Sequence, residues 1–246
     1  MTDAPAILSV VSAGPMVSIQ DVGRPRHRRF GIPASGPMDR RSAALANAAV
    51  GNDTGAPLVE VSAGGLGVEC TVAAVTVSVV GGSFLVDQAG HRHTGWCVRT
   101  LGSGERLDIR AGPAGNWCYL AVAGSLRVGQ WLGSAATHVP SGRGGGVVDV
   151  DTELAVDRPR VARELDGVID PPTLATGPGD AARPVVIRIV PGPQEHRFVA
   201  GALDRLVTGP FRATAGFDRM GLRLEGPDLE LADALSIPSE AVTRGA

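Results

Sequence analysis

Two short stretches near the N-terminus gather side chains that can bind or react with a polar ligand. Residues 20–24 read QDVGR and residues 35–39 read SGPMD, so that they combine an amide, two carboxylates, a guanidinium and a hydroxyl. Glycine occurs in both stretches and proline in the second, which is typical of a rigid polar loop and not of a hydrophobic core. We therefore expect the functional site to be built on this loop.

The flanking residues predict the elements that hold the loop in place. A short apolar run at residues 16–19 predicts a strand that leads into it. Asp39 has the side chain of a helix N-cap, and the Ala-rich segment behind it predicts a helix over residues 39–50, with Gly51 at its end. The loop and this helix should form one unit.

Several polar residues around this unit allow two interpretations. Asn47 either faces water or directs its amide at the ligand or the loop. Glu60 lies among β-branched neighbours, where it either pairs with Arg24 or occupies an exposed face. Four arginines around His27 either bind a carboxylate or phosphate or form a solvated charge run: Arg24, Arg26, Arg28 and Arg29.

The rest of the pattern favours an all-β protein with a few short helices. The chain of 246 residues contains 34 glycines and 18 prolines, and its apolar residues fall in short runs. Period-two alternation predicts strands at residues 75–79, 107–111 and 117–122, with Gly-rich turns between them. Close spacing of this kind is typical of a sandwich or barrel.

Composition divides the chain into two domains. Residues 1–156 should form the first β domain, and residues 157–184 become rich in proline and lose periodicity, as in a linker. A second domain then covers residues 185–246. In it we expect a strand over 185–190, a Pro/Gly loop, a short helix over 198–206, and strands at 211–214 and 222–225.

Charge and hydropathy exclude several partners. The net charge is -2, so no global positive field attracts nucleic acid. No apolar run reaches the length of a membrane span, and the N-terminus does not resemble a secretion signal, so we expect a cytoplasmic protein.

The chain contains no lysine, because all 23 basic residues are arginine. This excludes a Schiff base, a Walker-type phosphate loop and covalent biotin on this chain. If ATP or biotin takes part, another chain must hold much of it. The Gly-rich residues 142–146 therefore predict a flexible loop and not a phosphate site.

His91 and His93 raise the question of a metal site, since residues two apart on a strand share a face. Glu105 and His138 are the nearest further ligand candidates. The preceding QAG turn favours an exposed hairpin, and we expect no metal.

The motifs resemble the biotin-dependent carboxyltransferase family, which includes allophanate hydrolase subunit 2 and the group formed by KipA and the C subunit of 5-oxoprolinase. They run in family order along nearly the whole chain. The matching stretches are QDVGR at 20–24, SGPMD at 35–39, AN through VGN at 46–52, YLAVAG at 119–124, LGS at 132–134, PGPQ at 191–194 and DRMGLRLEG at 218–226.

This resemblance implies two cyclophilin-like β-barrels that work with A/B-type partner proteins in a heteromeric complex. One branch of the family opens the lactam 5-oxo-L-proline to L-glutamate with ATP, and another transfers a carboxyl group from carboxybiotin to urea or a related amide. A third role is a non-enzymatic antagonist of a KipI-like kinase inhibitor. Relatives continue past the position of Ala246, so we expect the second barrel to be truncated and incomplete.

The resemblance also assigns roles to individual residues, for a small amide or lactam substrate. Carboxylates can orient an amide N–H or move a proton, guanidinium groups suit anions, and side-chain amides can both donate and accept. We expect one loop from each half to converge on the substrate. The expected catalytic residues are Asp21, Asp39 and Gln194; the expected substrate-binding residues are Arg24, Ser35, Gly36, Met38, Asn47, Asn52, Gly192, Asp218 and Arg219.

Overall fold

A computed structural model describes residues 4–171 and 186–233 of the chain. The chain divides into two compact units. Unit 1 comprises residues 1–27 and 34–184, and unit 2 comprises residues 28–33 and 185–246. No helix within the described ranges is both long and apolar enough to cross a membrane.

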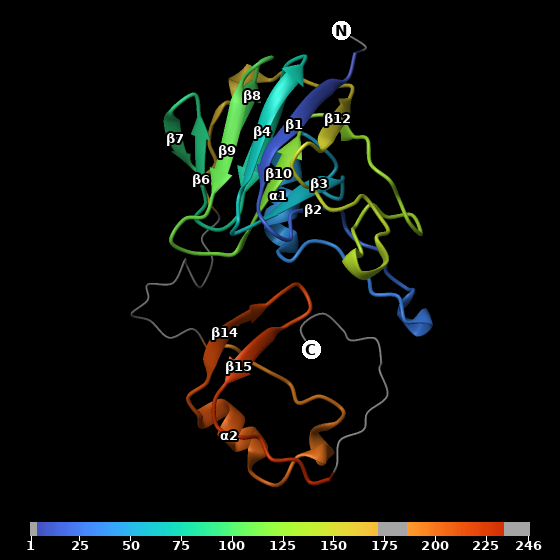
Figure 1. Cartoon of the computed structure of the whole chain (residues 1–246), viewed down its shortest axis with the longest axis vertical. Coiled ribbons are helices and arrows are strands. Elements are labelled where there is room, and N and C mark those ends of the chain that lie inside the picture. The colour runs from blue at the N-terminus through green and yellow to red at the C-terminus, as the bar shows by residue number, and fades with distance from the viewer. Residues whose placement is uncertain (1–3, 172–185, 234–246) are drawn as a thin grey trace. The chain divides into compact units, whose positions relative to one another are not determined.

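Unit 1 is built from two antiparallel sheets (Figure 1). The first has seven strands in the order β11-β12-β1-β4-β9-β6-β7, and the second has six in the order β13-β8-β5-β10-β3-β2. The strands of the first are β11 (Ser125–Leu126), β12 (Glu153–Asp157), β1 (Ala6–Ala13), β4 (Leu66–Val72), β9 (Arg106–Arg110), β6 (Leu85–Gln88) and β7 (His91–Thr94). Those of the second are β13 (Gly167–Val168), β8 (Cys97–Leu101), β5 (Val75–Val80), β10 (Trp117–Val122), β3 (Leu58–Ser62) and β2 (Ser18–Gln20).

The main hydrophobic core lies between these two sheets. Leu120 and Val122 of β10 enter it from one side, and Leu107 and Ile109 of β9 enter it from the other. Alternate residues of a strand point to opposite faces, so this spacing buries one face of each sheet. Burial of each such side chain contributes about 1.5–3 kcal/mol. The predominantly β class is confirmed, and neither sheet of unit 1 closes on itself.

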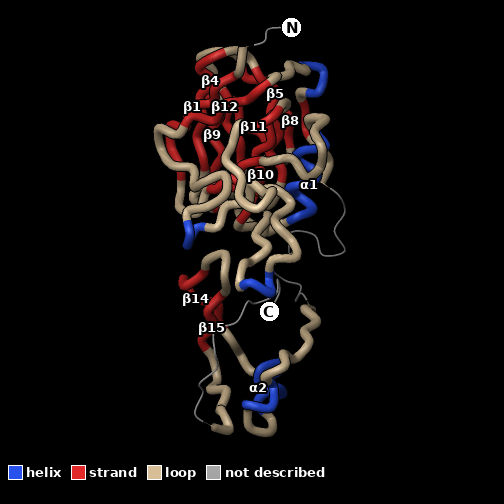
Figure 2. Tube along the Cα trace, turned by 90° about the vertical axis from the view of Figure 1, so that its right-hand side faces the viewer, coloured by secondary structure: helices blue, strands red, loops and turns tan. Residues whose placement is uncertain are grey.

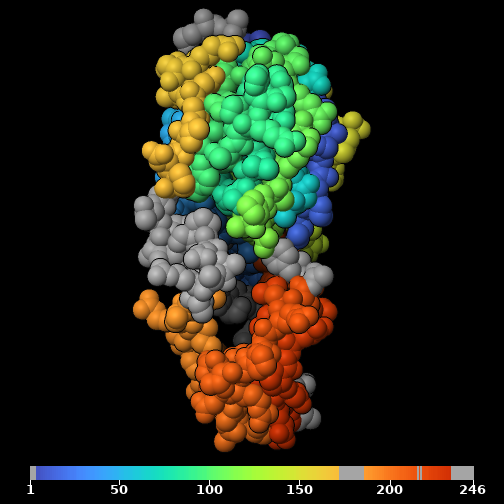
Figure 3. Space-filling model, turned by 90° about the vertical axis from the view of Figure 1, so that its left-hand side faces the viewer, coloured from blue at the N-terminus to red at the C-terminus, as the bar shows by residue number. Residues whose placement is uncertain are grey.

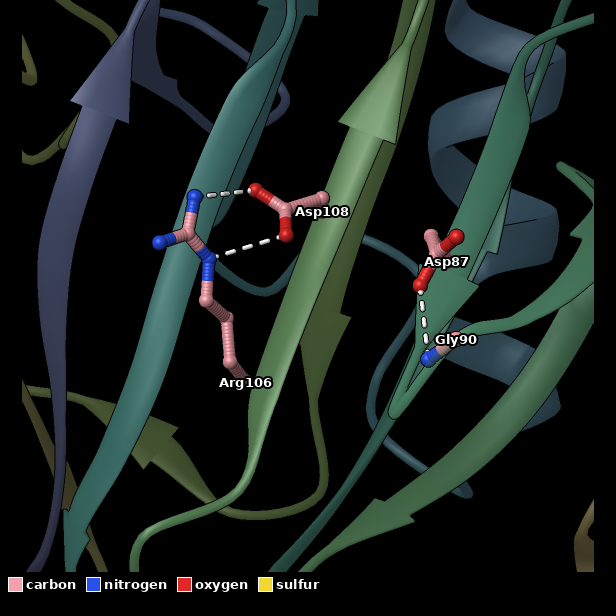
Figure 4. Close-up of polar contacts among 4 residues, drawn as sticks. All are labelled: Asp87, Gly90, Arg106 and Asp108. Carbon is pink, nitrogen blue, oxygen red and sulfur yellow. Dashed lines mark hydrogen bonds and ion pairs between the residues drawn. The ribbon is translucent and has the colours of Figure 1, made fainter.

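The outer face of the seven-stranded sheet is polar. Arg106 and Asp108 alternate on β9 with the two core residues, and Arg106 donates two hydrogen bonds to Asp108, at 2.8 and 2.6 Å (Figure 4). At the sheet edge, Asp87 accepts the Gly90 N–H at 3.0 Å and closes the turn between β6 and β7 (Figure 4). The HRH motif of residues 91–93 therefore lies on an edge hairpin.

Helix α1 (Arg40–Ala49) covers the second face of the six-stranded sheet (Figure 2). Its residues Ala43 and Ala46 pack against Tyr119 and Ala121 of β10, so strand β10 is buried on both faces. Small alanine side chains allow this helix to approach the sheet closely. The helix begins after Asp39 and is followed by Gly51 with φ +68°, as the sequence predicts.

The segment after β12 belongs to unit 1, although its composition suggested a linker. Strand β13 pairs with β8, and the backbone of Arg160 bonds to Ala123 and Thr76. Figure 3 shows these gold residues beside the green strands. Residues 157–171 also contain η3 (Arg163–Leu165). The pairing of β13 with β8 stabilises this segment, and composition alone does not reveal such pairing. The remaining linker residues, 172–184, lie outside the described residues.

Unit 2 contains helix α2 (Ala202–Thr208) and a hairpin of β14 (Arg212–Phe217) and β15 (Leu222–Glu225). A short helix η4 (Glu195–Arg197) precedes α2, and η1 (Arg28–Phe30) is grouped with this unit. Residues 186–190, in contrast, form no strand in the described structure, so the strand expected there is wrong for these positions. An apolar run becomes a strand only when another strand pairs with it. The expected truncation concerns residues 234–246 and beyond, which are outside the described structure.

Candidate functional site

Asp21 joins two loops of unit 1 that are far apart in the sequence. Its Oδ1 accepts hydrogen bonds from the Gly23 N–H at 2.8 Å, from the Ser134 hydroxyl at 2.6 Å and from the Ala136 N–H at 3.2 Å. Its Oδ2 accepts the Ala135 N–H at 2.6 Å. Because the carboxylate is buried and accepts four hydrogen bonds, most of its capacity is used in fixing the two loops.

Arg24 ties the same loops together from the other side. Its Nη1 donates to Ser35 Oγ at 2.9 Å, its Nε donates to the Trp131 carbonyl at 3.3 Å, and its Nη2 donates to the Ala136 carbonyl. The guanidinium carbon lies 4.8 Å from the centre of the Trp131 ring, within cation–π range. Arg24 is 2% exposed, and burial lowers its pKa while the charge of Asp21 acts in the opposite direction.

Glycines allow the two predicted stretches to cross closely. Gly23 has φ +86°, and a side chain there would place Cβ 2.5 Å from the Ala34 carbonyl oxygen. Gly36, with φ +93°, would meet the Val22 carbonyl oxygen at 3.2 Å. The Arg24 N–H donates to the Ala34 carbonyl at 2.7 Å across this crossing. Both glycines are therefore required by backbone geometry.

Asp39 and Met38 are fixed at the start of α1. Asp39 Oδ1 accepts the Arg41 and Ser42 N–H groups, both at 3.0 Å, and Oδ2 accepts the Ser42 hydroxyl at 2.5 Å. These are the bonds of a helix N-cap. Met38 donates its backbone N–H to Glu60 at 2.6 Å, and its side chain is exposed.

Glu60 forms a buried network that differs from both sequence interpretations. It is neither paired with Arg24 nor exposed. Its Oε2 accepts the Met38 N–H at 2.6 Å and the Tyr119 hydroxyl at 3.0 Å, while that hydroxyl accepts the Asp39 N–H at 2.6 Å. Sequence analysis did not identify Tyr119, the one tyrosine of the chain, because its position opposite Glu60 depends on the register of β10 against β3.

Asn47 and Asn52 connect the end of α1 to the sheet. Asn52 Nδ2 donates to Asn47 Oδ1 at 3.2 Å and to the Val122 carbonyl at 2.7 Å, and Asn47 Nδ2 donates to the Ala56 carbonyl at 2.9 Å. Arg160 donates to Asn52 Oδ1 at 2.6 Å. Asn52 thus has a structural role, whereas each end of the Asn47 amide keeps capacity for a further hydrogen bond.

A cavity of about 150 Å³ lies between the loop and α1 in unit 1. Two of the predicted site residues, Asp21 and Asn47, line the cavity, and Arg24 does not. Most of the wall is apolar, and the exposed Arg40 is its cationic member. The lining residues are Asp21, Val22, Pro37, Arg40, Ala43, Ala44, Asn47, Thr54, Ala56 and Leu58.

In unit 2, Gly192 and Gln194 line a second cavity of about 240 Å³, together with apolar residues such as Phe198 and Leu206. Asp218 lies in the turn between β14 and β15, where its Oδ1 accepts the Met220 and Gly221 N–H groups at 2.6 and 3.0 Å. Arg219 follows it in the same turn. The convergence of this turn with the Asp21 loop stays a prediction.

The loop held by Asp21 carries an aromatic and cationic cluster that the sequence did not single out. The rings of Trp131 and His138 stack with centres 6.0 Å apart, and the guanidinium of Arg143 lies 5.7 Å from the Trp131 centre. Burial, followed by the charge of Arg24, lowers the pKa of His138. The short LGS motif after Trp131 was the available signal.

The residues considered as metal or phosphate ligands have other neighbours in the described structure. Across 4–171 and 186–233, no three His, Cys, Asp or Glu side chains gather to hold a metal ion. Glu105 instead accepts the Gly102 N–H at 2.8 Å, and His138 belongs to the Trp131 cluster. The α1 N-terminus is already capped by Asp39, and Gly144 and Gly145 pack closely on Ala136 and Ile19.

Comparisons with known proteins agree on one family. The family model for the carboxyltransferase domain, subdomain A and B, matches residues 30–246. The C subunit of 5-oxoprolinase from Escherichia coli K12 is 31% identical over 240 residues, which are 91% of this chain and 70% of that protein. The urea amidolyase of Saccharomyces cerevisiae is 33% identical over 142 residues, which are 57% of this chain but 8% of that protein.

Solved structures support the same relationship. A crystal structure of TTHA0988 has a TM-score of 0.75 and 31% identity, covering 97% of this chain and 45% of that one. The urea amidolyase of K. lactis has a TM-score of 0.74 at 24% identity, covering 95% of this chain and 15% of that one, and it shows the fold alone. The chain thus spans less than half of either solved relative. It belongs to the carboxyltransferase domain family, subdomain A and B.

Proposed function

We propose that this chain is the C-type component of an ATP-dependent 5-oxoprolinase, which opens 5-oxo-L-proline to L-glutamate together with A- and B-type partner proteins. The observation that carries the proposal is the 31% identity to the E. coli C subunit over 91% of this chain and 70% of the relative. A second C subunit of 5-oxoprolinase, from Haemophilus influenzae, is 25% identical over 97% of this chain.

The cavity beside α1 suits the proposed substrate. Its volume of about 150 Å³ is smaller than the roughly 300–1,000 Å³ of pockets for drug-sized ligands, which favours a ligand of few atoms. Ala43, Ala44 and Leu58 offer an apolar wall to the carbons of a lactam ring. The remaining capacity of the Asn47 amide matches a lactam N–H and carbonyl, and Arg40 matches the carboxylate of 5-oxoproline.

The binding of ATP is a further part of the proposal. Unoccupied backbone N–H groups at a helix N-terminus and a phosphate loop with its lysine are two common sites for a triphosphate. In α1 the side chain of Asp39 already accepts those N–H groups, and the chain has no lysine. ATP would supply the free energy for opening the amide, and we assign its binding to the partner proteins.

A carboxyltransferase acting on urea or a related amide is the second candidate. The urea amidolyase of S. cerevisiae favours it, with 33% identity over 142 residues. Urea is also a small planar amide, but it has no carboxylate for Arg40. Turnover that requires a carboxylate on the substrate therefore favours the 5-oxoprolinase component, and turnover without one favours the carboxyltransferase.

The test is to co-express the chain with A- and B-type partners and to measure ATP hydrolysis with 5-oxoproline or urea. We expect hydrolysis that depends on 5-oxoproline and on this chain. Arg40→Ala should raise the KM for 5-oxoproline about tenfold or more, because a charged hydrogen bond contributes about 1.5–3 kcal/mol. The neighbouring exposed Arg41 does not line the cavity, so Arg41→Ala is the matched control and should leave the KM unchanged.

Turnover that depends on urea and a biotin carrier, but not on 5-oxoproline, would instead establish the second candidate. Equal KM values for the two arginine variants would remove the cavity beside α1 from the substrate site, while leaving the family membership intact.

A further inference from the structure

The connection between β11 and β12 is long and mostly irregular. We call residues 127–152 the Trp131 loop; it is drawn yellow-green to yellow in Figure 1. Its regular structure is one short helix, η2 (Val139–Ser141), and a few isolated bridges. Loops of more than about 12–15 residues without their own secondary structure usually serve a function.

The Trp131 loop is held in one conformation by the core of unit 1. Asp21 binds its Ser134, Ala135 and Ala136, and the Gly145 N–H donates to the Ala135 carbonyl at 2.7 Å. The Thr137 hydroxyl donates to the Ile19 carbonyl at 2.7 Å. A loop fixed in this way loses little conformational entropy when a partner binds to it.

The tip of the loop exposes apolar side chains. Trp131 and Ser134 exchange two backbone hydrogen bonds around a tight turn, with Leu132 at φ +52° and 44% exposed. A leucine in the left-handed region is uncommon, because its side chain disfavours that conformation. Val139 is 54% exposed next to His138, whose ring stacks on Trp131. Glycine would adopt this φ without strain, so the leucine occupies the position at a conformational cost.

The charge beside these apolar groups is positive. Arg143 is exposed, lies over the Trp131 ring and forms no ion pair within the described residues. No Asp or Glu occurs between Arg127 and Val148, and the two aspartates of the Trp131 loop, Asp149 and Asp151, lie at its end next to β12. A carboxylate from another molecule is the natural partner of such a cation.

The shape of the surface favours a protein over a small molecule. Small ligands bind in concave pockets, and neither the cavity beside α1 nor the one in unit 2 is lined by a residue of the Trp131 loop. Rigid aromatic and arginine side chains beside exposed aliphatic groups are instead typical of the centre of a protein interface.

We propose that Leu132, Val139 and Arg143 of the Trp131 loop form a docking surface for an acidic segment of a partner protein of the complex. This proposal rests on the proposed function, because that function supplies the partner. Leu132 and Val139 contact apolar side chains of the segment, and Arg143 binds a carboxylate beside them.

The test measures binding of the purified chain to its co-expressed A- and B-type partners by surface plasmon resonance. Arg143→Glu should weaken binding about tenfold or more, mainly through a slower association that becomes less sensitive to salt. Leu132→Gly should also weaken binding about tenfold, mainly through faster dissociation. Since glycine suits φ +52°, this variant should keep or raise the melting temperature, which distinguishes lost contact from misfolding.

Matched controls lie at the other end of the seven-stranded sheet. Arg92→Glu on β7 makes the same charge change, and Leu85→Ser on β6 removes a leucine that is 41% exposed; both should leave binding unchanged. Equal binding by Arg143→Glu and wild type, in a complex that still turns over 5-oxoproline, overturns the docking surface alone. Absence of any wild-type binding overturns both proposals. Arg143→Glu could instead leave partner binding unchanged and abolish self-association or ATP binding. That result would give the surface a different ligand and would also overturn the docking proposal.

Discussion

Two turns of the molecule use the same local chemistry in different surroundings. In unit 1, Asp21 accepts the N–H of Gly23 two residues ahead; in unit 2, Asp218 accepts the N–H groups of Met220 and Gly221. Asp21 is buried and also accepts three hydrogen bonds from residues 134–136, whereas Asp218 is exposed and these two local bonds join it to its own turn. The first turn therefore fixes the tertiary structure, and the second shapes its own hairpin.

An Asp–Gly turn in a family motif therefore does not by itself indicate catalysis. The side chains of the Asp21 turn hold the Trp131 loop against the sheet. Substitutions in this turn should lower the free energy of unfolding more than they change catalysis directly. The loss of unfolding free energy should be smaller for a residue whose hydrogen bonds join only residues close to it in the sequence.

The largest effect is expected for Asp21→Ala. The substitution leaves the Ala135 N–H and the Ser134 hydroxyl without their buried acceptor, and we expect a loss of about 3 kcal/mol or more of unfolding free energy. Asp218→Ala should cost about 0.5 kcal/mol or less, as for an ordinary surface substitution. Urea unfolding followed by circular dichroism measures both. Similar losses in the two variants would remove the distinction between the turns.

Arg24→Lys should have the next largest effect. An ammonium group retains the charge but cannot reach Ser35 and the two backbone carbonyls in the fixed geometry of a guanidinium. We expect a loss of about 2 kcal/mol in the same unfolding experiment. Arg92→Lys on the exposed hairpin is the control and should be neutral. Full stability of Arg24→Lys would mean that charge alone holds the loops together.

Asp39 is an intermediate case, because its side-chain bonds are local but they begin a helix that covers the sheet. Asp39→Ala should cost about 1 kcal/mol, the usual contribution of an N-cap. Asp39→Ser restores a capping oxygen and should recover most of this loss. A serine variant as unstable as the alanine variant would show that the carboxylate acts beyond the cap.

The smallest effect concerns pH. The pKa of His138 lies below its ordinary value of 6.5, first because of burial and then because of Arg24; Arg143 is a further cation near its stacking partner. The unfolded chain therefore binds a proton more readily than the folded chain. Stability should be fully present above pH 6.5 and decrease as pH falls toward the folded pKa. His138→Gln should flatten this part of the profile in unfolding experiments between pH 5 and 8; an unchanged slope would contradict the assignment.

Local signals in the sequence predict much of the fold. Asp39, the alanines behind it and Gly51 mark α1, and alternation marks β5, β9 and β10. These features depend on residues within one element. Residues 186–190 have the same apolar composition but form no strand in the described structure, because pairing depends on other segments.

The contacts of the candidate site are harder to predict from the sequence than the elements of the fold. The motif identifies Asp21 and Arg24, but their partners on the Trp131 loop lie more than a hundred residues further along the chain. Glu60 is another example: the sequence indicates a costly carboxylate, and the register of β10 against β3 provides Tyr119 as its partner. Contacts of this range follow from topology, which spacing along one strand does not encode.

Under the proposed function, the loop residues position the site and the assembled complex opens the lactam. The direct measurement is glutamate formation from 5-oxoproline by the reconstituted complex, with wild type and Asp39→Ser side by side. We expect glutamate with wild type and a rate within about threefold for the variant, since removing a general acid or base would cost about 10²–10⁴-fold. A folded Asp39→Ser chain that loses more than about a hundredfold, or a wild-type complex that forms no glutamate, would contradict this expectation.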